Sequence, residues 1–265
     1  MPSTPARDGA QIGFDQAGAG PPLVLIHGIT ESSHTWDPLI PALAQAHTVL
    51  TVDLPGHGES GPAASYDIRA LAEAVADVVE AAGLQSPVVV GHSLGAMVAT
   101  AYGAAHPVRA IMNVDQPLQL AELQGALSQL EPMLRGDQAT FAAAIGAVFD
   151  AMYGQLSDAE RQRVAGLRQL DQDVVLGIWA PLLDAPPEAL DELVRSIGSA
   201  VDVPYLSLHG IDPGHGYPGW LAKVIPGATV EVWPGLGHYP HLAEPERFLD
   251  RLADFEHSSA RGPVQ

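Results

Sequence analysis

Short runs of apolar residues alternate with longer stretches rich in alanine and leucine along much of the chain. Strands inside a sheet that is covered on both faces are apolar throughout, whereas helices packed on such a sheet repeat apolar positions every three or four residues. The short runs therefore predict buried parallel strands, and the longer stretches predict helices between them. The predicted strands are residues 23–27, 49–53, 88–90, 110–114, 204–209 and 229–233, and the predicted helices are residues 36–46, 68–82, 96–105 and 245–255.

The alternation is interrupted once, between residues 117 and 201. This segment has a helical composition without strand-like runs, and its prolines and glycines divide it into about four helices, including residues 138–152 and 158–179. The whole pattern predicts an α/β fold with a mostly parallel, doubly wound central sheet flanked by helices. The predicted division is a core domain of residues 1–116 and 202–265 and an inserted helical cap of residues 117–201.

Charge and composition narrow the classes of partner. The chain has 31 Asp and Glu residues against 12 Lys and Arg residues, a formal net charge of -19, so nucleic acids and anionic membrane surfaces would be repelled. It has no cysteine, which excludes disulfides, thiol nucleophiles and thiolate metal sites. Residues 1–20 have no apolar core of signal-peptide length, which predicts a cytoplasmic protein. We expect a small-molecule partner, whereas the oligomeric state is not indicated.

The segment Gly-His-Ser-Leu-Gly, residues 91–95, lies between the strand predicted at 88–90 and the helix predicted at 96–105. A G-x-S-x-G sequence in this context is typical of a sharp strand-to-helix turn that strains the serine backbone and exposes its hydroxyl group. The helix that follows directs its N-terminus toward the same place. We therefore predict Ser93 as a nucleophile and the backbone N–H of Leu94 as one donor of an oxyanion hole. The alternative is an ordinary glycine-containing turn.

A serine hydroxyl is a poor nucleophile until a base takes its proton. His238 lies in a glycine-rich segment directly after the last predicted strand, where a loop can bring the imidazole over the carboxyl edge of the sheet. We predict His238 as the base, and His241, further along the same segment, is the alternative.

The base in turn needs a carboxylate that orients it and stabilises its protonated form. Asp212 follows the strand predicted at 204–209, and Asp115 follows the strand predicted at 110–114. Either residue lies at the carboxyl end of a strand, where α/β sheets place their functional loops. We favour Asp212 as the acid and keep Asp115 as the alternative acid.

The second oxyanion donor is expected in the loop after the first predicted strand. Gly28 permits a close approach of a substrate, so the backbone N–H of Ile29 would face the substrate oxygen together with that of Leu94. We expect His27 to form hydrogen bonds within this loop and not to take part in the chemistry.

Four motifs stand in order along the chain: His27-Gly28, Asp-Leu-Pro-Gly-His-Gly-Glu-Ser at residues 53–60, the segment 91–95, and Gly237-His238. Together they resemble the α/β-hydrolase fold superfamily, in its serine hydrolase or esterase-like form with a helical cap, over roughly residues 12–255. The resemblance implies a parallel sheet with an antiparallel early strand and a catalytic triad in the order serine, acid, histidine.

Carried over to this chain, the resemblance puts the nucleophile on Ser93, the base on His238 and the oxyanion donors on Ile29 and Leu94. The family usually has two residues between a glycine and the acid after the penultimate strand, whereas here only Ile211 separates Gly210 from Asp212. Some members place the acid after the strand before it, and Asp115 therefore stays open.

The expected reaction is hydrolysis of a carboxylic ester or lactone through an acyl-enzyme intermediate, for which no cofactor or metal is required. Apolar side chains in the predicted cap favour a small to medium, largely apolar substrate. A C–C bond hydrolase, a thioesterase or a perhydrolase would use the same triad, and a non-catalytic ligand-binding receptor of the same fold is a further alternative. The candidate cap residues for the substrate pocket are Met133, Phe141, Phe149, Met152, Tyr153 and Trp179.

Overall fold

An eight-stranded sheet forms the centre of the protein, which a computed structural model describes for residues 1–260. The strand order is β1-β2-β4-β3-β5-β6-β7-β8; the pairs β1·β2 and β2·β4 are antiparallel, and all other pairs are parallel. The predicted mostly parallel sheet is therefore confirmed, with an antiparallel beginning. The strands are β1 (Ser3–Pro5), β2 (Gln11–Ala17), β3 (Pro22–Ile26), β4 (Thr48–Val52), β5 (Val88–His92), β6 (Ala110–Val114), β7 (Tyr205–His209) and β8 (Ala228–Val232).

Helices cover both faces of this sheet. Successive side chains of a strand point to opposite faces, and in β3 Val24 packs in one apolar cluster while Leu23 packs in the other. The first cluster lies under α2 (Ile68–Ala81), α3 (Leu94–Ala105), α8 (Pro187–Gly198) and α9 (Tyr217–Val224). The second lies under the 3-10 helix η1 (Ser33–Trp36), α1 (Ile40–Leu43), α10 (Pro240–Ala243) and α11 (Pro245–Ala260).

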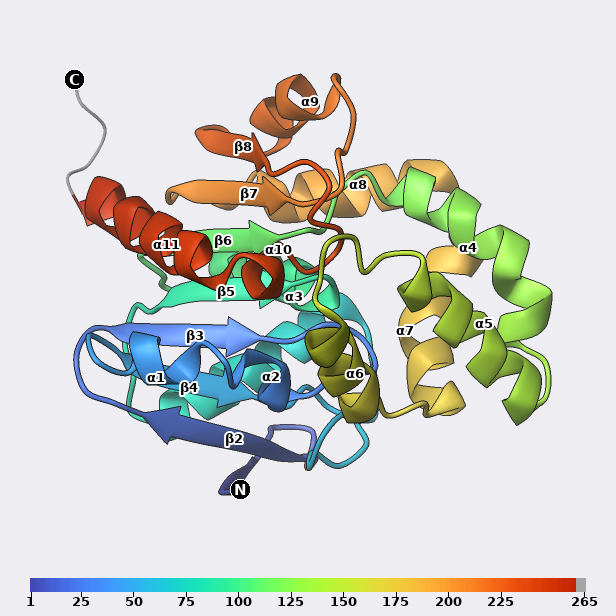
Figure 1. Ribbon diagram of the computed structural model, residues 1–265, viewed down its shortest axis with the longest axis horizontal. Coiled ribbons are helices and arrows are strands. Elements are labelled where there is room, and N and C mark those ends of the chain that lie inside the picture. Colours follow the sequence, from blue (N-terminus) through green and yellow to red (C-terminus); the bar gives the residue numbers. More distant parts are fainter. Residues whose placement is uncertain (261–265) are drawn as a thin grey trace.

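Within the described residues, five helices separate β6 from β7, and we call them the helical insertion. Figure 1 shows α4, α5 and α7 beyond the arrowheads of β3, β5 and β6, so these helices lie over the carboxyl edge of the sheet. They share an apolar cluster of their own, which includes Phe141 and Val175. The helices are α4 (Leu120–Leu134), α5 (Gln138–Asp150), α6 (Asp158–Leu167), α7 (Gln172–Asp184) and α8, which packs beside α3.

One predicted helix is wrong near the start of the chain. Residues 36–46 form no continuous helix but the end of η1 and the short α1. Pro38 and Pro41 lie in this stretch, and a proline has no N–H to continue a helical hydrogen-bond ladder.

The helix predicted at residues 158–179 is also wrong, because it is two helices, α6 and α7. The chain leaves the helical conformation at Arg168, and the N–H of Gln169 donates to the carbonyl of Thr30 at 2.8 Å. The side chain of Asp171 then caps α7. A contact with the core therefore interrupts the helix and raises the number of insertion helices above the four expected.

None of the helices in residues 1–260 combines the length and the apolar composition needed to cross a bilayer.

Candidate active site

Ser93 occupies the turn between β5 and α3. Its backbone has φ 52° and ψ -124°, a region that residues other than glycine rarely adopt. A Cβ on Gly91 would lie 2.1 Å from the carbonyl oxygen of Gly95, and a Cβ on Gly95 would lie 2.3 Å from that of Ile26, so both positions must be glycine. Ser93 lines a cavity of about 720 Å³. This strained turn has the geometry expected of a nucleophile elbow.

His238 lies in the loop between β8 and α10, where it is buried except toward the same cavity. Its Nδ1 lies 2.7 Å from Oδ2 of Asp115, and its backbone N–H donates to the carbonyl of Met152 at 2.7 Å. His241, the alternative base, is buried with both ring nitrogens unpartnered among the described residues, and it does not line the cavity. The structure therefore brings His238, and not His241, to a carboxylate and to the cavity that Ser93 lines.

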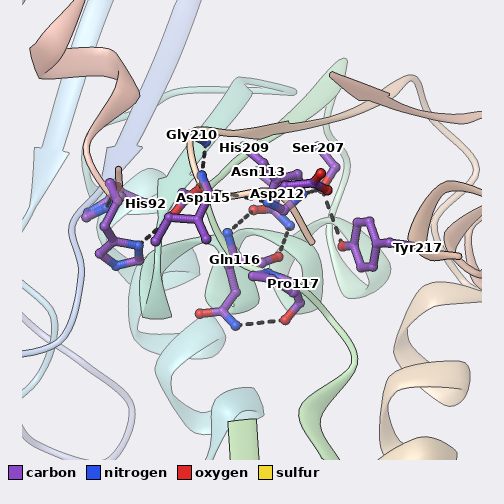
Figure 2. A network of polar contacts seen from close by, with 12 residues as sticks. His92, Asn113, Asp115, Gln116, Pro117, Ser207, His209, Gly210, Asp212 and Tyr217 are labelled. Atoms are coloured by element: carbon purple, nitrogen blue, oxygen red, sulfur yellow. Dashed lines mark hydrogen bonds and ion pairs between the residues drawn. The ribbon is translucent and has the colours of Figure 1, made fainter. Parts of the chain in front are cut away.

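The two candidate acids differ sharply in position. Figure 2 shows Asp115 at the end of β6, close to Gly210; its Oδ1 accepts hydrogen bonds from the N–H groups of Gly210 at 2.7 Å and Ile211 at 3.1 Å. Asp212 is exposed, and its Oδ1 accepts from the N–H of Gly214 at 2.8 Å within its own loop. The structure thus corrects the preference of the sequence: the carboxylate beside His238 belongs to Asp115, the alternative, because the shortened loop after β7 leaves Asp212 facing solvent.

The turn that carries Asp115 is built by its neighbours. Asp115 has φ 57°, and Asn113 holds the turn with two hydrogen bonds: its Nδ2 donates to the carbonyl of Gln116 at 2.8 Å, and its Oδ1 accepts from the N–H of Gln116 at 3.1 Å. The Asn113 amide also donates to the hydroxyl of Tyr205 at 3.1 Å. Because each of these groups is buried and paired, the Asp115 carboxylate has little freedom to turn away from His238.

The protonation states of the pair follow from its surroundings. Burial alone would raise the pKa of Asp115, but the hydrogen bonds from His238 and from the N–H of Ile211 lower it below its ordinary value. Burial lowers the pKa of His238, although Asp115 works in the opposite direction. At neutral pH Asp115 is therefore ionised and His238 is neutral, with its Nδ1–H held by the carboxylate and its Nε2 able to accept a proton.

The two predicted oxyanion donors, Ile29 and Leu94, both line the cavity with Ser93. Leu94 is the first residue of α3, where an N–H group has no intrahelical partner, and within residues 1–260 the N–H of Ile29 makes no hydrogen bond to a loop or turn carbonyl. The two segments approach closely, because a Cβ on Gly28 would lie 3.2 Å from the Cβ of Ser93. His27 is tied into the loop as expected: its Nε2 accepts from the N–H of Leu54 at 3.0 Å.

The cavity has a volume of about 720 Å³ and lies between the sheet and the helical insertion. It falls in the range of about 300 to 1,000 Å³ that is usual for small-molecule sites. Of the six cap residues expected to line it, Phe149, Met152 and Trp179 do so. Met133, Phe141 and Tyr153 do not line the cavity; Met133 is exposed, and Phe141 lies in the apolar cluster of the insertion.

One group near the site gave no signal in the sequence. Glu31 is a buried carboxylate in the loop after β3, two residues beyond Ile29. A single acidic residue in a loop is usually exposed, so nothing in the sequence indicates that Glu31 lies in the interior. The one feature that distinguishes it is its place within residues 29–33, a segment that is buried throughout.

Within residues 1–260, no three His, Asp or Glu side chains are grouped in a way that could hold a metal ion.

Comparison with known proteins gives consistent relatives. A model of the alpha/beta hydrolase family matches residues 23–251. The chain is 30% identical over 249 residues to a pimeloyl-[acyl-carrier protein] methyl ester esterase of Neisseria meningitidis serogroup C. This alignment covers 87% of this chain and 91% of that protein. It is 29% identical over 258 residues to a 2-(acetamidomethylene)succinate hydrolase of Mesorhizobium japonicum, which covers 91% of this chain and 89% of that protein.

Among solved structures, an esterase from Exiguobacterium antarcticum has a TM-score of 0.79 with this chain at 20% identity, over 96% of this chain and 98% of that one. This likeness shows that the two proteins share a fold.

Proposed function

Because the chain belongs to the alpha/beta hydrolase family, we propose that it is a serine hydrolase that cleaves a carboxylic ester or lactone of a small to medium, largely apolar substrate. The observation that carries the proposal is the hydrogen bond of 2.7 Å between His238 and Asp115, beside a serine on a strained turn that faces the same cavity. That the chain is an enzyme and an ester hydrolase in general terms follows from its family and its esterase relatives.

The proposed mechanism uses these residues in a fixed order. Oγ of Ser93 attacks the carbonyl carbon, and Nε2 of His238 takes the hydroxyl proton. Asp115 keeps the Nδ1–H of His238 in place and stabilises the imidazolium that forms. The N–H groups of Ile29 and Leu94 donate to the oxyanion of the tetrahedral intermediate.

Collapse of that intermediate breaks the bond to the leaving alcohol, which receives its proton from His238. Water then attacks the acyl-enzyme, with His238 again taking a proton, and the acid leaves as Ser93 recovers its hydroxyl group.

The cavity supports the choice of substrate. Its walls are mostly aliphatic and aromatic, and Arg69 is the one cationic side chain among the described residues that line it. A strongly anionic acyl group would find few partners there. The relative in Neisseria, a methyl ester esterase by name, is consistent with an acyl chain in such a cavity.

The domain division belongs to the proposal as well. We assign residues 1–116 and 202–265 to the core, of which 261–265 lie outside the described residues, and residues 117–201 to a helical cap that closes the cavity. A cytoplasmic location also stays a prediction.

The test is turnover of a chain-length series of p-nitrophenyl esters by the wild type and three variants. Ser93→Ala should lose nearly all activity, and Asp115→Asn should lose about a factor of 10³ to 10⁴ in kcat because the histidine adopts the wrong tautomer. Asp212→Asn, the matched control on the neighbouring strand end, should stay within about threefold, since its side chain is exposed and distant from the mechanism. Full activity of Ser93→Ala, or a greater loss in Asp212→Asn than in Asp115→Asn, would contradict the proposal.

A wild type that hydrolyses none of these esters but is labelled at Ser93 by a fluorophosphonate would move the search to lactones, thioesters or C–C substrates. Absence of both turnover and labelling would favour a ligand-binding role.

A further inference from the structure

The carboxylate of Glu31 is buried and fully partnered although it lies outside the proposed triad. Its side chain is 1% exposed. Oε1 accepts a hydrogen bond from the hydroxyl of Tyr239 at 2.6 Å, and Oε2 accepts one from the N–H of Gly28 at 3.1 Å and lies 3.3 Å from Nδ1 of His92. Burying a charge is costly unless it is paired and hydrogen-bonded. The partners around the Glu31 carboxylate offset this cost, which indicates that the fold holds it in this position.

His92, the residue before Ser93, bridges two acceptors. Its Nδ1 faces Oε2 of Glu31, and its Nε2 lies 2.8 Å from the backbone carbonyl of His238. A carboxylate and a carbonyl can only accept hydrogen bonds, and a neutral imidazole can donate from only one nitrogen. Both contacts can be hydrogen bonds at the same time only when His92 carries a proton on each nitrogen.

The helical insertion reaches the same group through Arg168, at the break between α6 and α7. One terminal nitrogen donates to the hydroxyl of Tyr239 at 2.7 Å, and the other donates to Oγ1 of Thr30 at 3.2 Å. The guanidinium carbon lies 3.5 Å from the ring centroid of Phe149, which lines the cavity. The series Arg168, Tyr239, Glu31, His92 therefore runs from the insertion to the carbonyl of His238.

The pKa shifts of Glu31 and Tyr239 agree with hydrogen bonds that run from Arg168 through Tyr239 to Glu31. Burial would raise the pKa of Glu31, but His92 and Arg168 hold it well below its ordinary range. Burial and the charge of Glu31 raise the pKa of Tyr239 well above its ordinary value. The phenol therefore keeps its proton, accepts from Arg168 and donates to Glu31.

We propose that Glu31 is a positioning residue: with His92, Tyr239 and Arg168 it fixes the oxyanion loop, the nucleophile elbow and the histidine loop relative to one another, and docking of the insertion through Arg168 completes this arrangement. The inference rests on the proposed function, because it concerns the loops that carry the proposed triad. None of the four residues is among the described residues that line the cavity. They act on the geometry of the reaction and not on contact with the substrate.

Kinetics of Glu31→Gln and Arg168→Met test the proposal. Each should lower kcat by about 10- to 100-fold, the usual cost of a small misplacement of catalytic groups, while KM changes by less than about twofold. Arg168→Lys should restore part of the loss, since it keeps the charge but not both hydrogen bonds.

Arg163→Met is the matched control. Arg163 also crosses from the insertion to the core, where it donates to the carbonyls of His34 at 2.8 Å and Thr35 at 3.0 Å, but it contacts none of the four residues. Its kcat should stay close to that of the wild type. An equal loss in Arg163→Met and Arg168→Met, or a rise in KM in place of a fall in kcat, would overturn the proposal in favour of general docking or substrate contact.

A measurement that does not depend on turnover separates this proposal from the proposed function. In ¹H–¹⁵N spectra at pH 7, the His92 ring of the wild type should show two N–H groups, and that of Glu31→Gln should show one. A single N–H in the wild type would refute the network even in an active esterase. Conversely, two N–H groups in a protein that neither turns over esters nor labels at Ser93 would leave the network in place while the proposed function fails.

Should Glu31→Gln not fold, Tyr239→Phe takes its place in the kinetic experiment, since it removes only the hydroxyl that joins Arg168 to Glu31. Unchanged kcat in a folded Tyr239→Phe would overturn the proposal.

Discussion

The loops at the carboxyl edge of the sheet and the helices above them differ in how closely other atoms surround their glycines. A Cβ on Gly95, in the elbow, would lie 2.3 Å from the carbonyl oxygen of Ile26 and 2.5 Å from that of His27. Gly125 in α4 and Gly146 in α5 have no atom within 4 Å of such a Cβ, and the nearest atoms to a Cβ on Gly177 in α7 or Gly198 in α8 belong to side chains, at 2.6 and 2.5 Å. Main-chain contacts therefore fix the elbow, whereas the insertion helices are set by side-chain packing.

The same two regions differ in their chemistry. All eleven histidines of the chain lie outside residues 117–201, and several are buried around the elbow. The insertion contributes mainly apolar walls to the cavity, with Arg168 as one of its polar links to the core. On the proposed function, the core supplies the reacting groups, and the insertion supplies the volume in which a substrate is selected.

Among the variants that compare these two regions, Gly95→Ala should have the largest effect. The added methyl group would force α3 away from β3 and so move Ser93 relative to Ile29. We expect a loss of about 3 kcal/mol in the free energy of unfolding or more, with kcat/KM lowered by about 100-fold or more. Urea unfolding and ester kinetics measure both. Gly125→Ala is the control, and a Gly95→Ala protein that is as active and as stable as this control would show that the elbow is not fixed by its contacts.

The contrast between the two regions also explains what the sequence could predict. Strands β3 to β8 are short apolar runs, and the elbow is a local motif, so their positions follow from neighbouring residues alone. Strand β2 was missed because it lies near the edge of the sheet and is only partly buried, which removes its apolar run.

Two other features depend on contacts that no local pattern encodes. Which of Asp115 and Asp212 meets His238 is decided by the turn that Asn113 holds and by the N–H groups of the β7 loop. The break between α6 and α7 occurs where Gln169 bonds the core. Both are set by tertiary structure. The sequence offered two acids and favoured Asp212, and it predicted one helix where the structure has two.

A second prediction concerns the loss of stability in acid. We expect the histidines of the core to cause it, because the insertion has no histidine. Burial lowers the pKa of His57 and of His209 to about 4. Between pH 4 and the ordinary histidine value of about 6.5, these groups are neutral when folded and protonated when unfolded. The unfolded state then binds more protons, so stability falls as the pH falls, by about 1.4 kcal/mol per pH unit for each group.

Urea unfolding of the wild type and of His57→Gln at pH 5 and pH 7 checks this. The variant should lose about 2 kcal/mol less than the wild type between the two values. His257→Gln, at an exposed position on α11, should behave as the wild type does. Identical pH slopes for all three proteins would rule out the buried histidine as a source of acid sensitivity.

A change in the wall of the cavity should alter selection without disturbing the reacting groups. Trp179 lines the cavity from α7 and is partly exposed, so Trp179→Ala should enlarge the site at little cost in stability. The ratio of kcat/KM for a long-chain ester to that for a short-chain ester should rise about tenfold, in line with the value of one or two methylene groups in an apolar pocket. Met133→Ala, exposed on α4 and outside the cavity, should leave the ratio unchanged. Equal ratios in both variants would show that Trp179 does not select the substrate.

The smallest effect is expected from Gly146→Ala, the counterpart of Gly95→Ala in the insertion. A glycine inside a helix costs about 1 kcal/mol relative to alanine because it loses more backbone entropy on folding. Since nothing lies within 4 Å of the added methyl group, the variant should gain about 0.5 to 1 kcal/mol in the free energy of unfolding with unchanged kcat. A fall in kcat would mean that the backbone of α5 is coupled to the reacting groups. The division of roles between the core, which carries the reacting groups, and the insertion, which shapes the cavity, would then fail even at a position where the structure leaves room for the added atom.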